Sequence, residues 1–498
     1  MPSSTVLAPK HFTREQAPLI TAWKNKALTD GFAVGPFSQQ EIETGVGTFV
    51  CVPLTVVHTP ATDTKAEKNR VCFNASWPTN VESGSMGIQS INDEIQGEDW
   101  TCEWLLITEV KLLLAYAGPR ARAMGFDLAD AYQQLPNAPW QRRRFVFEVE
   151  GEFFVWIVGM FGIATMAALF GQLCDVLCWW IERSFPSVKA RHFADDHLLL
   201  HDGTDSCPPT TAIYAEVARF GWRVHATKHF SWSRRFVLLG FEWDMDQKTV
   251  ALTEDKRSKY LRKLSAVLTS TAVRYQDISS VAGTLIHVCS VFPERRSSLN
   301  AIYAFRNRFN RRRRFQSLKI PTSTASELRS WITFLQTPSL VRSFRPPASS
   351  FPHLVYSDAS NLGCGVVIDG RAQAWALPGI IDEEGIDIGV MEAWALQLAL
   401  EACISMGARD CTVRFQVDNL GVVYAFRKGR SRSKWTNCCL RCIAELAVAT
   451  NITMSMAYVA SADNLADAPS RGDCSQFQML HLELAAPWQE FLGAAPQS

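Results

Sequence analysis

The stretch Arg191-His192-Phe193-Ala194-Asp195-Asp196-His197-Leu198-Leu199-Leu200 places two adjacent aspartates between apolar residues. A third aspartate, Asp127, lies upstream in a similar setting, Gly125-Phe126-Asp127-Leu128. Carboxylates in apolar surroundings repel one another and lose hydration, so a positive group must neutralise them. Hard oxygen ligands favour Mg²⁺. Acids that meet from two strand ends and hold metal ions about 4 Å apart are typical of in-line phosphoryl or nucleotidyl transfer.

Length and charge limit the classes of protein that fit this sequence. The 498 residues suffice for three or four domains, and 47% hydrophobic with 20% charged residues is an ordinary globular composition. The net charge is only +1, but 18 Lys and Arg against 5 Asp and Glu lie between Thr253 and Arg345, which leaves the remainder near −12. A basic middle flanked by acid-bearing segments predicts a channel for a polyanion between two metal sites.

The fourteen cysteines are expected to be reduced thiols, because the N-terminus carries no cleavable signal. We therefore expect a nuclear or cytoplasmic protein that is neither secreted nor membrane-bound. Cys439 and Cys442 form half a zinc site, and a structural zinc ion there is the less favoured alternative because no second pair follows at zinc-finger spacing.

One uncharged run, residues 153–174, is long enough to span a bilayer. The favoured interpretation is a buried strand over residues 153–158, a break at Gly159 and Gly162, and a following helix. A membrane protein built around residues 153–181 is the alternative.

The expected fold class is mixed α+β and α/β with several domains, because short β-rich runs alternate with helical patterns. The expected segments are 1–60, an N-terminal extension of unknown role; 61–252, strands alternating with helices; 253–345, basic and helical; 346–350, a linker; 351–473, an α/β domain; and 474–498, a tail.

Five motifs follow one another between residues 68 and 241. They are Phe126-Asp127-Leu128-Ala129-Asp130-Ala131-Tyr132, Phe161-Gly162-Ile163-Ala164-Thr165-Met166-Ala167-Ala168-Leu169-Phe170, Phe193-Ala194-Asp195-Asp196, Lys228 and Leu238-Leu239-Gly240-Phe241. Their order and spacing resemble the fingers and palm of reverse transcriptases. The resemblance implies that Asp127 and Asp195 bridge two Mg²⁺ ions, which Mn²⁺ can replace, and that Asp196 supports them. Lys228 stands at the position of a lysine that is a candidate proton donor to the leaving pyrophosphate.

The same resemblance implies substrate contacts. Tyr132 falls at the position of an aromatic steric gate that excludes a 2′-hydroxyl, with a core tyrosine as the alternative. Phe161 and Gly162 belong to the turn that packs against template and incoming nucleotide. Lys68 and Arg70 lie where the fingers grip the triphosphate, and a guanidinium suits bidentate phosphate binding. The alternative for this pair is a solvated charged face.

Four further acids, Asp358, Glu392, Asp418 and Asp467, are expected to come from separate strands and helices, with Glu392 opening a helix. Four such carboxylates can hold two Mg²⁺ ions around a phosphodiester. Their order resembles that of an RNase H domain, and Ala466-Asp467-Ala468-Pro469-Ser470-Arg471 closely resembles the ending of retrotransposon RNase H domains. Asp463 is the less favoured alternative to Asp467.

The densest basic run is expected to contact the phosphates of a duplex, which would make binding steeply dependent on salt. It comprises Arg306, Arg308, Arg311, Arg312, Arg313 and Arg314. A nuclear-import signal or a solvated helix face are the alternatives. Residues 279–285, with Gly283, resemble a thumb pattern in which small residues allow close helix packing.

The phrases Asn74-Ala75-Ser76-Trp77-Pro78 and Ser90-Ile91-Asn92-Asp93-Glu94-Ile95 resemble the tyrosine-recombinase (DIRS-type) retrotransposons. Together the resemblances imply an RNA-directed DNA polymerase joined to an RNase H. Its expected partners are an RNA template, a DNA primer, an RNA–DNA hybrid, deoxynucleoside triphosphates and other products of the same element, and no membrane. A decayed or domesticated copy that only binds nucleic acid is the alternative.

Overall fold

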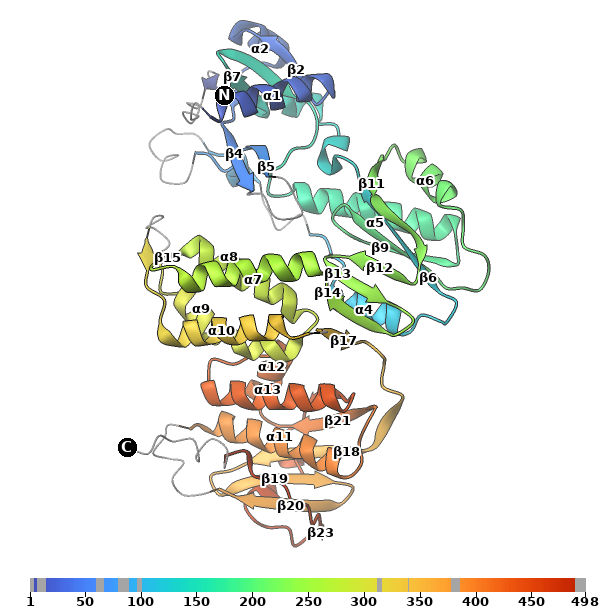
Figure 1. Cartoon of the computed structure of the whole chain (residues 1–498), viewed down its shortest axis with the longest axis vertical. Helices are drawn as coiled ribbons and strands as arrows, with labels where there is room; N and C mark the ends of the chain where they lie inside the picture. The colour runs from blue at the N-terminus through green and yellow to red at the C-terminus, as the bar shows by residue number, and fades with distance from the viewer. Residues whose placement is uncertain are drawn as a thin grey trace. The chain divides into compact units, whose positions relative to one another are not determined.

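The computed structural model describes residues 4–6, 15–59, 67–78, 89–95, 101–310, 316–338, 340–377 and 386–488 (Figure 1). The chain forms two compact units, Met1–Gln247 and Lys248–Ser498. Each unit contains both helices and strands, so the fold is a mixed α/β multidomain fold. The predicted segments 253–345 and 351–473 both fall within the second unit, and the boundary between them stays a prediction.

The first sheet of the N-terminal unit draws on residues from both sides of the boundary predicted at residue 60. Its strand order is β1-β3-β7-β8-β2. The strands and the helices beside them are β1 (Thr5–Val6), β2 (Ala33–Phe37), β3 (Val50–Cys51), β7 (Val146–Val149), β8 (Glu152–Trp156), α1 (Ala17–Thr29) and α2 (Gln39–Val46). Trp23 of α1 stacks on Trp156 with ring centroids 5.4 Å apart, and Phe147 also lies 5.4 Å from Trp23. Residues 15–59 therefore share a core with residues 145–156 and are no separate extension.

A two-stranded ladder adjoins this core. Strands β4 (Leu54–Thr59) and β5 (Lys68–Phe73) pair in antiparallel register, with Leu54 opposite Phe73. Phe73 contacts Trp23 and Trp156 edge-on, with centroids 5.8 and 5.2 Å away. These aromatic contacts fix the base of the ladder.

The second sheet of this unit carries the paired aspartates. Its antiparallel strands, in the order β11-β6-β10-β9, are β6 (Arg122–Leu128), β9 (Val188–Phe193), β10 (Asp196–His201) and β11 (Val224–Ser233). Helices α5 (Met166–Ser184) and α6 (Thr210–Arg219) accompany it (Figure 1). Phe170, Leu177 and Ile181 repeat along one stripe of α5 and are buried in the core that includes Met124 and Leu199 of the sheet.

The smaller elements of the first unit complete it. They are α4 (Ile107–Ala115), η1 (Asn92–Glu94), η3 (Ala131–Gln134), η4 (Pro139–Arg144), β12 (Arg235–Leu238) and β13 (Phe241–Asp244). Leu239 and Gly240 form the two-residue turn between β12 and β13, with φ of +53° and +82°. Positive φ at both positions matches the twist of a tight hairpin.

The uncharged run 153–174 is not one helix. Strand β8 ends at Trp156, a loop with two glycines follows, and α5 begins at Met166. Gly159 fits this loop because a Cβ there would lie 2.3 Å from the carbonyl oxygen of Tyr132. Among the described residues, one helix, α11 (Ile388–Ser405), is long and apolar enough to cross a membrane, and 72% of it is buried within the fold, as in a core helix.

The second unit begins with the helices expected from the basic middle. Its elements up to residue 343 are β14 (Thr249–Leu252), α7 (Glu254–Thr269), β15 (Val273–Arg274), α8 (Tyr275–Cys289), η5 (Pro293–Leu299), α9 (Asn300–Arg306), β16 (Ser317–Leu318), α10 (Thr322–Gln336) and β17 (Val341–Ser343). The expectation that Gly283 allows close helix packing is wrong. Gly283 is exposed, and a Cβ there would meet nothing within 4 Å, because α8 buries Ile278, Val281 and Leu285 instead.

A six-stranded sheet follows, in the order β22-β21-β18-β19-β20-β23. Its elements are β18 (Ser349–Ala359), β19 (Gly363–Ile368), β20 (Arg371–Ala376), α11, β21 (Cys411–Val417), α12 (Leu420–Lys428), α13 (Lys434–Ala449), β22 (Thr453–Tyr458), η7 (Ser461–Asp463), α14 (Asp467–Ser470) and β23 (Gln478–Met479).

Two predicted boundaries in this region are wrong. The linker predicted at 346–350 is too long, because Ser349 and Ser350 already belong to β18 and lie opposite Cys411 and Thr412. Glu392 does not open its helix, because Asp387 caps α11 by accepting the backbone N–H of Val390.

The two faces of β19 contact different helices. Cys364 donates its thiol to the Met391 carbonyl of α11 at 3.5 Å. On the opposite face, a Cβ on Gly365 would lie 2.4 Å from the backbone nitrogen of Ser470 and 2.7 Å from the Ala466 carbonyl oxygen. Glycine at this position therefore lets α14 lie directly on the sheet.

Replacing Gly365 with Ala should destabilise the second unit by about 1–3 kcal/mol, because the new methyl group has no room. Gly283→Ala is the matched control and should stabilise the chain by about 0.5–1 kcal/mol, since its site is open and helical. Denaturant midpoints of the full chain measure both changes. A Gly365→Ala protein as stable as the wild type would contradict the close approach.

Candidate functional site

Three aspartates meet at one end of the four-stranded sheet, and we call them the first acidic cluster: Asp127, Asp195 and Asp196. Asp196, the first residue of β10, lies directly opposite Asp127 of β6. Asp195 occupies the two-residue turn between β9 and β10, where Ala194 has a φ of +52°. Leu128 donates its backbone N–H to the carbonyl oxygen of Asp195 at 3.1 Å, which ties the turn to β6.

The chain partly compensates the charge of this cluster. Asp127 is buried, and Lys228 of β11 donates from Nζ to its Oδ2 at 2.9 Å. This hydrogen bond raises the pKa of Lys228. Burial, and then the nearby charge of Asp127, raises the pKa of Asp195. A carboxylate whose ionisation is opposed by burial and a neighbouring acid is suited to a divalent cation, which relieves the repulsion.

Two buried histidines hold the turn, and the sequence pattern gave them no role. His192 donates from Nδ1 to the Ala194 carbonyl at 3.2 Å, and His197 donates from Nδ1 to the Asp195 carbonyl at 3.0 Å. Their rings stack with centroids 5.6 Å apart, and His197 also stacks on Phe126 at 4.8 Å. Burial lowers the pKa of His197 to about 3, so this ring stays neutral. Their positions directly flanking the turn are the signal that could have found them.

The loop between β8 and α5 lies against the end of β5. Gly162 has a φ of +107°, and a Cβ there would lie 2.5 Å from the carbonyl oxygen of Phe73. Asn92 donates from Nδ2 to the Gly162 carbonyl and accepts from the Ala164 N–H at Oδ1, each at 2.9 Å. Asn92 therefore clamps the loop from both sides, a role that its motif alone did not reveal.

Tyr132 lies beside the first acidic cluster. Its ring packs against Phe161 and Phe170, with centroids 4.8 and 5.3 Å away. Burial, and then the charge of Asp195, raises the pKa of the phenol. The ring is thus held by aromatic packing and lies close enough to Asp195 to feel its negative charge.

Lys68 and Arg70 belong to β5. Arg70 is exposed and lies opposite Val57 of β4. The side chain of Lys68 lies outside the described residues. Triphosphate contact by this pair stays a prediction.

The second unit brings together a second acidic cluster: Asp358, Glu392 and Asp418. Asp358 lies near the end of β18, Glu392 on α11, and Asp418 directly after β21. One carboxylate oxygen of each lies within 4.8 Å of the others. Asp358 and Glu392 are only 4% and 5% exposed, so these charges are close together and largely withdrawn from water.

Electrostatic strain is pronounced in the second acidic cluster. Burial, and then the charges of Asp358 and Asp418, raises the pKa of Glu392 to about 9. Burial, opposed by a hydrogen bond from Ser470, raises the pKa of Asp358 to about 6. Glu392 Oε2 and Asp418 Oδ1 are buried without a hydrogen-bond partner among the described residues. Such oxygens suit Mg²⁺ or Mn²⁺, since both prefer carboxylate ligands.

Asp467, the first residue of α14, lies near this cluster but outside the set of three. Its charge raises the pKa of Asp358, while Arg471 donates to its Oδ1 at 2.8 Å. Asn464 is buried and donates to Asp358 Oδ1 at 3.4 Å. Asp463 is exposed at the end of η7. The charge of Asp467 thus acts on Asp358, and the choice of Asp467 over Asp463 as the fourth acid stays a prediction.

Two of the predicted basic residues lie within the described part of the chain. Arg306 ends α9 and lies over the Tyr303 ring at 4.8 Å, and Arg308 is exposed just beyond it. Arg430, which the sequence pattern did not single out, lies over the same ring at 4.5 Å. The run Arg311, Arg312, Arg313 and Arg314 lies outside the described residues.

No family model matches the sequence, and no curated protein matches it. The fold is similar to three solved structures of the foamy viral protease-reverse transcriptase. The complex with an RNA/DNA hybrid has a TM-score of 0.50 and 14% identity over 94% of this chain and 56% of that chain. The dRH form with ds DNA has a TM-score of 0.50 and 13% identity over 92% and 72%. The complex with dsDNA has a TM-score of 0.50 and 14% identity over 93% and 88%.

The chain thus spans about half, 56%, of the foamy viral chain in the hybrid complex. At these identities the likeness establishes the fold. The chain is a mixed α/β multidomain protein whose fold is similar to that of the foamy viral protease-reverse transcriptase.

The raised pKa of Glu392 predicts how stability depends on pH. The folded protein holds this proton more tightly than the unfolded chain, so metal-free stability falls as the pH rises from about 4.5 towards about 9. Glu392→Gln should therefore raise the metal-free stability at pH 8 by roughly 1–2 kcal/mol and leave little gain at pH 5.

Exposed Glu483 offers the matched control, since Glu483→Gln makes the same chemical change without relieving burial. Thermal melts at both pH values, with and without Mg²⁺, report the result. Added Mg²⁺ should stabilise the wild type more than Glu392→Gln. Equal melting temperatures for wild type and Glu392→Gln at pH 8 would contradict the repulsion.

Proposed function

We propose that the chain is an RNA-directed DNA polymerase of a retroelement, fused to an RNase H that cleaves the RNA strand of RNA–DNA hybrids. The observation that carries this proposal is the pair of acidic clusters at strand ends, one in each unit. Their setting in a fold similar to foamy viral protease-reverse transcriptase supports it. In this assignment residues 61–252 are fingers and palm, 253–345 thumb and connection, and 351–473 the RNase H domain.

The first acidic cluster would hold two Mg²⁺ ions, with Mn²⁺ able to replace them. Bound Mg²⁺ supplies a lower pKa for the primer 3′-hydroxyl and charge neutralisation of the triphosphate. Lys228, which donates to Asp127 Oδ2 at 2.9 Å and has a raised pKa in the metal-free protein, would give its proton to the leaving pyrophosphate. Asp195 and Asp196 complete the ligand set from the turn and the start of β10.

Nucleotide selection would depend on the residues around the loop between β8 and α5. Tyr132, braced by Phe161 and Phe170, would exclude a 2′-hydroxyl and so favour deoxynucleoside triphosphates. Gly162 lets the loop lie against the Phe73 carbonyl of β5, and the loop would then pack against the template and the incoming nucleotide. Lys68 and Arg70 would bind the triphosphate.

The second acidic cluster, together with Asp467, would hold two Mg²⁺ ions at the scissile phosphate of the RNA strand. Bound Mg²⁺ supplies an activated water and stabilises the departing 3′-oxygen. Selectivity for RNA would come from 2′-hydroxyl contacts. Arg306, Arg308 and the run at 311–314 would contact phosphates, which predicts a steep salt dependence of binding.

The element from which the chain derives is, in this proposal, of the tyrosine-recombinase (DIRS) type. The protein would act in the nucleus or cytoplasm, away from membranes, beside other products of the same element. The phrases at residues 74–78 and 90–95 support this subgroup.

Primer extension on an RNA template tests DNA synthesis. Asp195→Asn should lower extension by about 10³-fold or more, because the site loses a metal ligand. Asp130→Asn is the matched control, since Asp130 is exposed, pairs with Arg223, and has a φ of +54° that Asn tolerates. It should extend like the wild type. A wild type that binds the duplex yet neither extends nor cleaves with Mg²⁺ or Mn²⁺ would instead identify a nucleic-acid-binding relic.

Cleavage of the RNA strand of a hybrid tests the second site in the same reaction. Asp467→Asn should reduce cleavage strongly and leave extension intact, whereas Asp463→Asn should leave both intact. The two variants carry the same Asp→Asn change four residues apart, at the end of η7 and the start of α14, so we expect similar effects on folding. The reverse result would move the fourth ligand to Asp463.

A further inference from the structure

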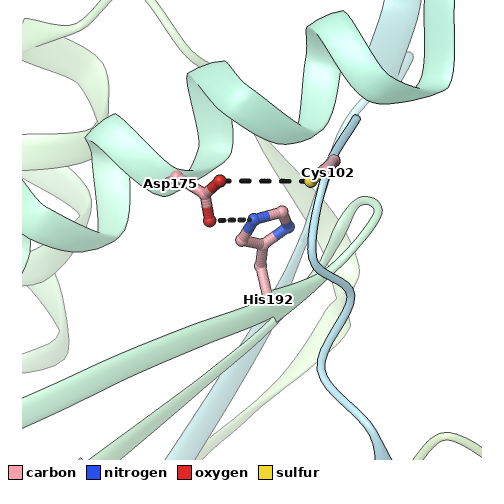
Figure 2. Close-up of side chains that lie close together, drawn as sticks. All are labelled: Cys102, Asp175 and His192. Carbon is pink, nitrogen blue, oxygen red and sulfur yellow. Dashed lines mark hydrogen bonds and ion pairs between the residues drawn. The ribbon is translucent and has the colours of Figure 1, made fainter. Parts of the chain in front are cut away.

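A separate set of side chains of the metal-ligand type lies behind the turn that carries Asp195. Cys102, Asp175 of α5 and His192 of β9 converge there (Figure 2), with their ligand atoms within 4.8 Å of one another. Asp175 Oδ1 lies 2.9 Å from His192 Nε2, and Asp175 Oδ2 lies 3.9 Å from Cys102 Sγ. Asp175 and His192 also line a cavity of about 300 Å³, to which Glu103 adds negative charge.

In the neutral form of His192, one ring nitrogen is a hydrogen-bond acceptor that faces another acceptor. Nδ1 lies 3.2 Å from the Ala194 carbonyl oxygen, which can only accept, so Nδ1 carries a proton. In the neutral ring Nε2 is then a bare lone pair, and it points at a carboxylate oxygen 2.9 Å away. Two acceptors in contact require a second ring proton or a cation between them. His192 is only 4% exposed, whereas the Asp175 side chain is 57% exposed, so water reaches the contact from the carboxylate side.

A second histidine–aspartate contact in the same sheet is balanced without a cation. His201 accepts the backbone N–H of Gly203 at Nδ1, 3.0 Å away. Its Nε2 is then free to carry the single proton of the neutral ring and to donate it to Asp205 Oδ1 at 2.7 Å. The two histidines differ in the partner of Nδ1. A carbonyl oxygen keeps the proton on Nδ1 of His192, whereas a backbone N–H leaves the proton of His201 on Nε2, where it can bond the carboxylate.

The backbone around Cys102 is built to bring the thiol to this point. A Cβ on Gly171 of α5 would lie 2.3 Å from Cys102 Sγ, so glycine there makes room for the sulfur. Gln172 donates to the Thr101 carbonyl at 3.0 Å. On the other side, the Leu105 N–H donates to the His192 carbonyl at 3.2 Å. Residues 101–105 are therefore held between α5 and β9, with the thiol turned to Asp175.

We propose that Cys102, Asp175 and His192 form a zinc site with its fourth position open to water. One thiolate, one imidazole and one carboxylate are a typical ligand set for Zn²⁺ and a poor one for Mg²⁺. Bonds of about 2.0–2.3 Å from one ion would separate the ligand atoms by about 3–4 Å, close to the spacing present. The ion would take the lone pair of Nε2 while Nδ1–H stays on a backbone carbonyl, a usual arrangement for metal-bound histidine.

A bound ion would restrain the turn between β9 and β10 through the hydrogen bond from His192 to the Ala194 carbonyl. The acceptor of the Nδ1–H bond is Ala194, the neighbour of Asp195, so an ion on Nε2 would hold the turn that carries Asp195. This consequence for synthesis rests on the proposed function. The proposed metal site does not depend on that function, and metal binding can be measured without an assay of enzyme activity.

Cobalt substitution tests the site directly. The full chain is stripped with a chelator, dialysed, and titrated with Co²⁺ in excess Mg²⁺, which occupies the carboxylate clusters. The wild type should bind one Co²⁺ with a thiolate-to-cobalt charge-transfer band and release it to one equivalent of Zn²⁺. Cys102→Ser should abolish the band, and Asp175→Asn should weaken Zn²⁺ binding by at least about 10–100-fold, which is what the loss of an outer-shell partner costs, because a ligand itself is removed.

Two variants serve as matched controls. Asp205→Asn makes the same chemical change at the His201 contact, and Cys207→Ser makes it at a thiol near Asp205; both should keep the band and the affinity. No band in the wild type, or a band that survives Cys102→Ser, would overturn the proposal. Equal weakening in Asp175→Asn and Asp205→Asn would do the same, since it would point to general destabilisation or adventitious binding.

Discussion

The mutual repulsion of buried carboxylates is the constraint on which both units depend. The fold brings three aspartates to one end of a sheet in the first unit and three carboxylates within 4.8 Å of one another in the second. The chain relieves part of the repulsion itself, through Lys228 at Asp127 and through raised pKa values at Asp358 and Glu392. The remainder is a standing cost to stability. A bound cation would relieve this repulsion in either unit, and metal-binding sites commonly trade stability for function.

The surroundings of the acids are rigid because backbone and side chains approach them closely. Gly162 allows the loop before α5 to touch β5, and Asn92 clamps that loop from both sides. Gly365 lets α14 lie directly on β19. These contacts hold backbone segments in place without touching the acids themselves, and preorganised sites require rigid surroundings of this kind. The loop before α5 and the helix α14 that begins with Asp467 are therefore held by packing that has no room for an added methyl group.

The sequence indicated that Asp127, Asp195, Asp196, Asp358 and Asp418 lie at or beside strand ends, because each adjoins an apolar run. Glu392 lies within a helix and Asp467 begins one, and the metal-binding role of all these acids stays a prediction. The sequence could not show the supports. The roles of His192 and His197 depend on which carbonyls the turn presents, and that of Asn92 on a contact seventy residues along the chain. Packing of residues 15–59 with 145–156 is equally non-local. The wrong expectations, at Gly283, at the start of α11 and at the linker before β18, concern places where tertiary packing or strand pairing overrides local composition.

The most direct test of the account is to locate the cations. Crystals of the chain with an RNA–DNA hybrid, grown with Mn²⁺ and measured at the manganese absorption edge, report metal positions independently of activity. The account predicts anomalous peaks bound by Asp127 and Asp195 in the first unit and by Asp358, Glu392 and Asp418 in the second, with Lys228 displaced from Asp127. Peaks absent from both clusters, with Lys228 still on Asp127, would contradict it.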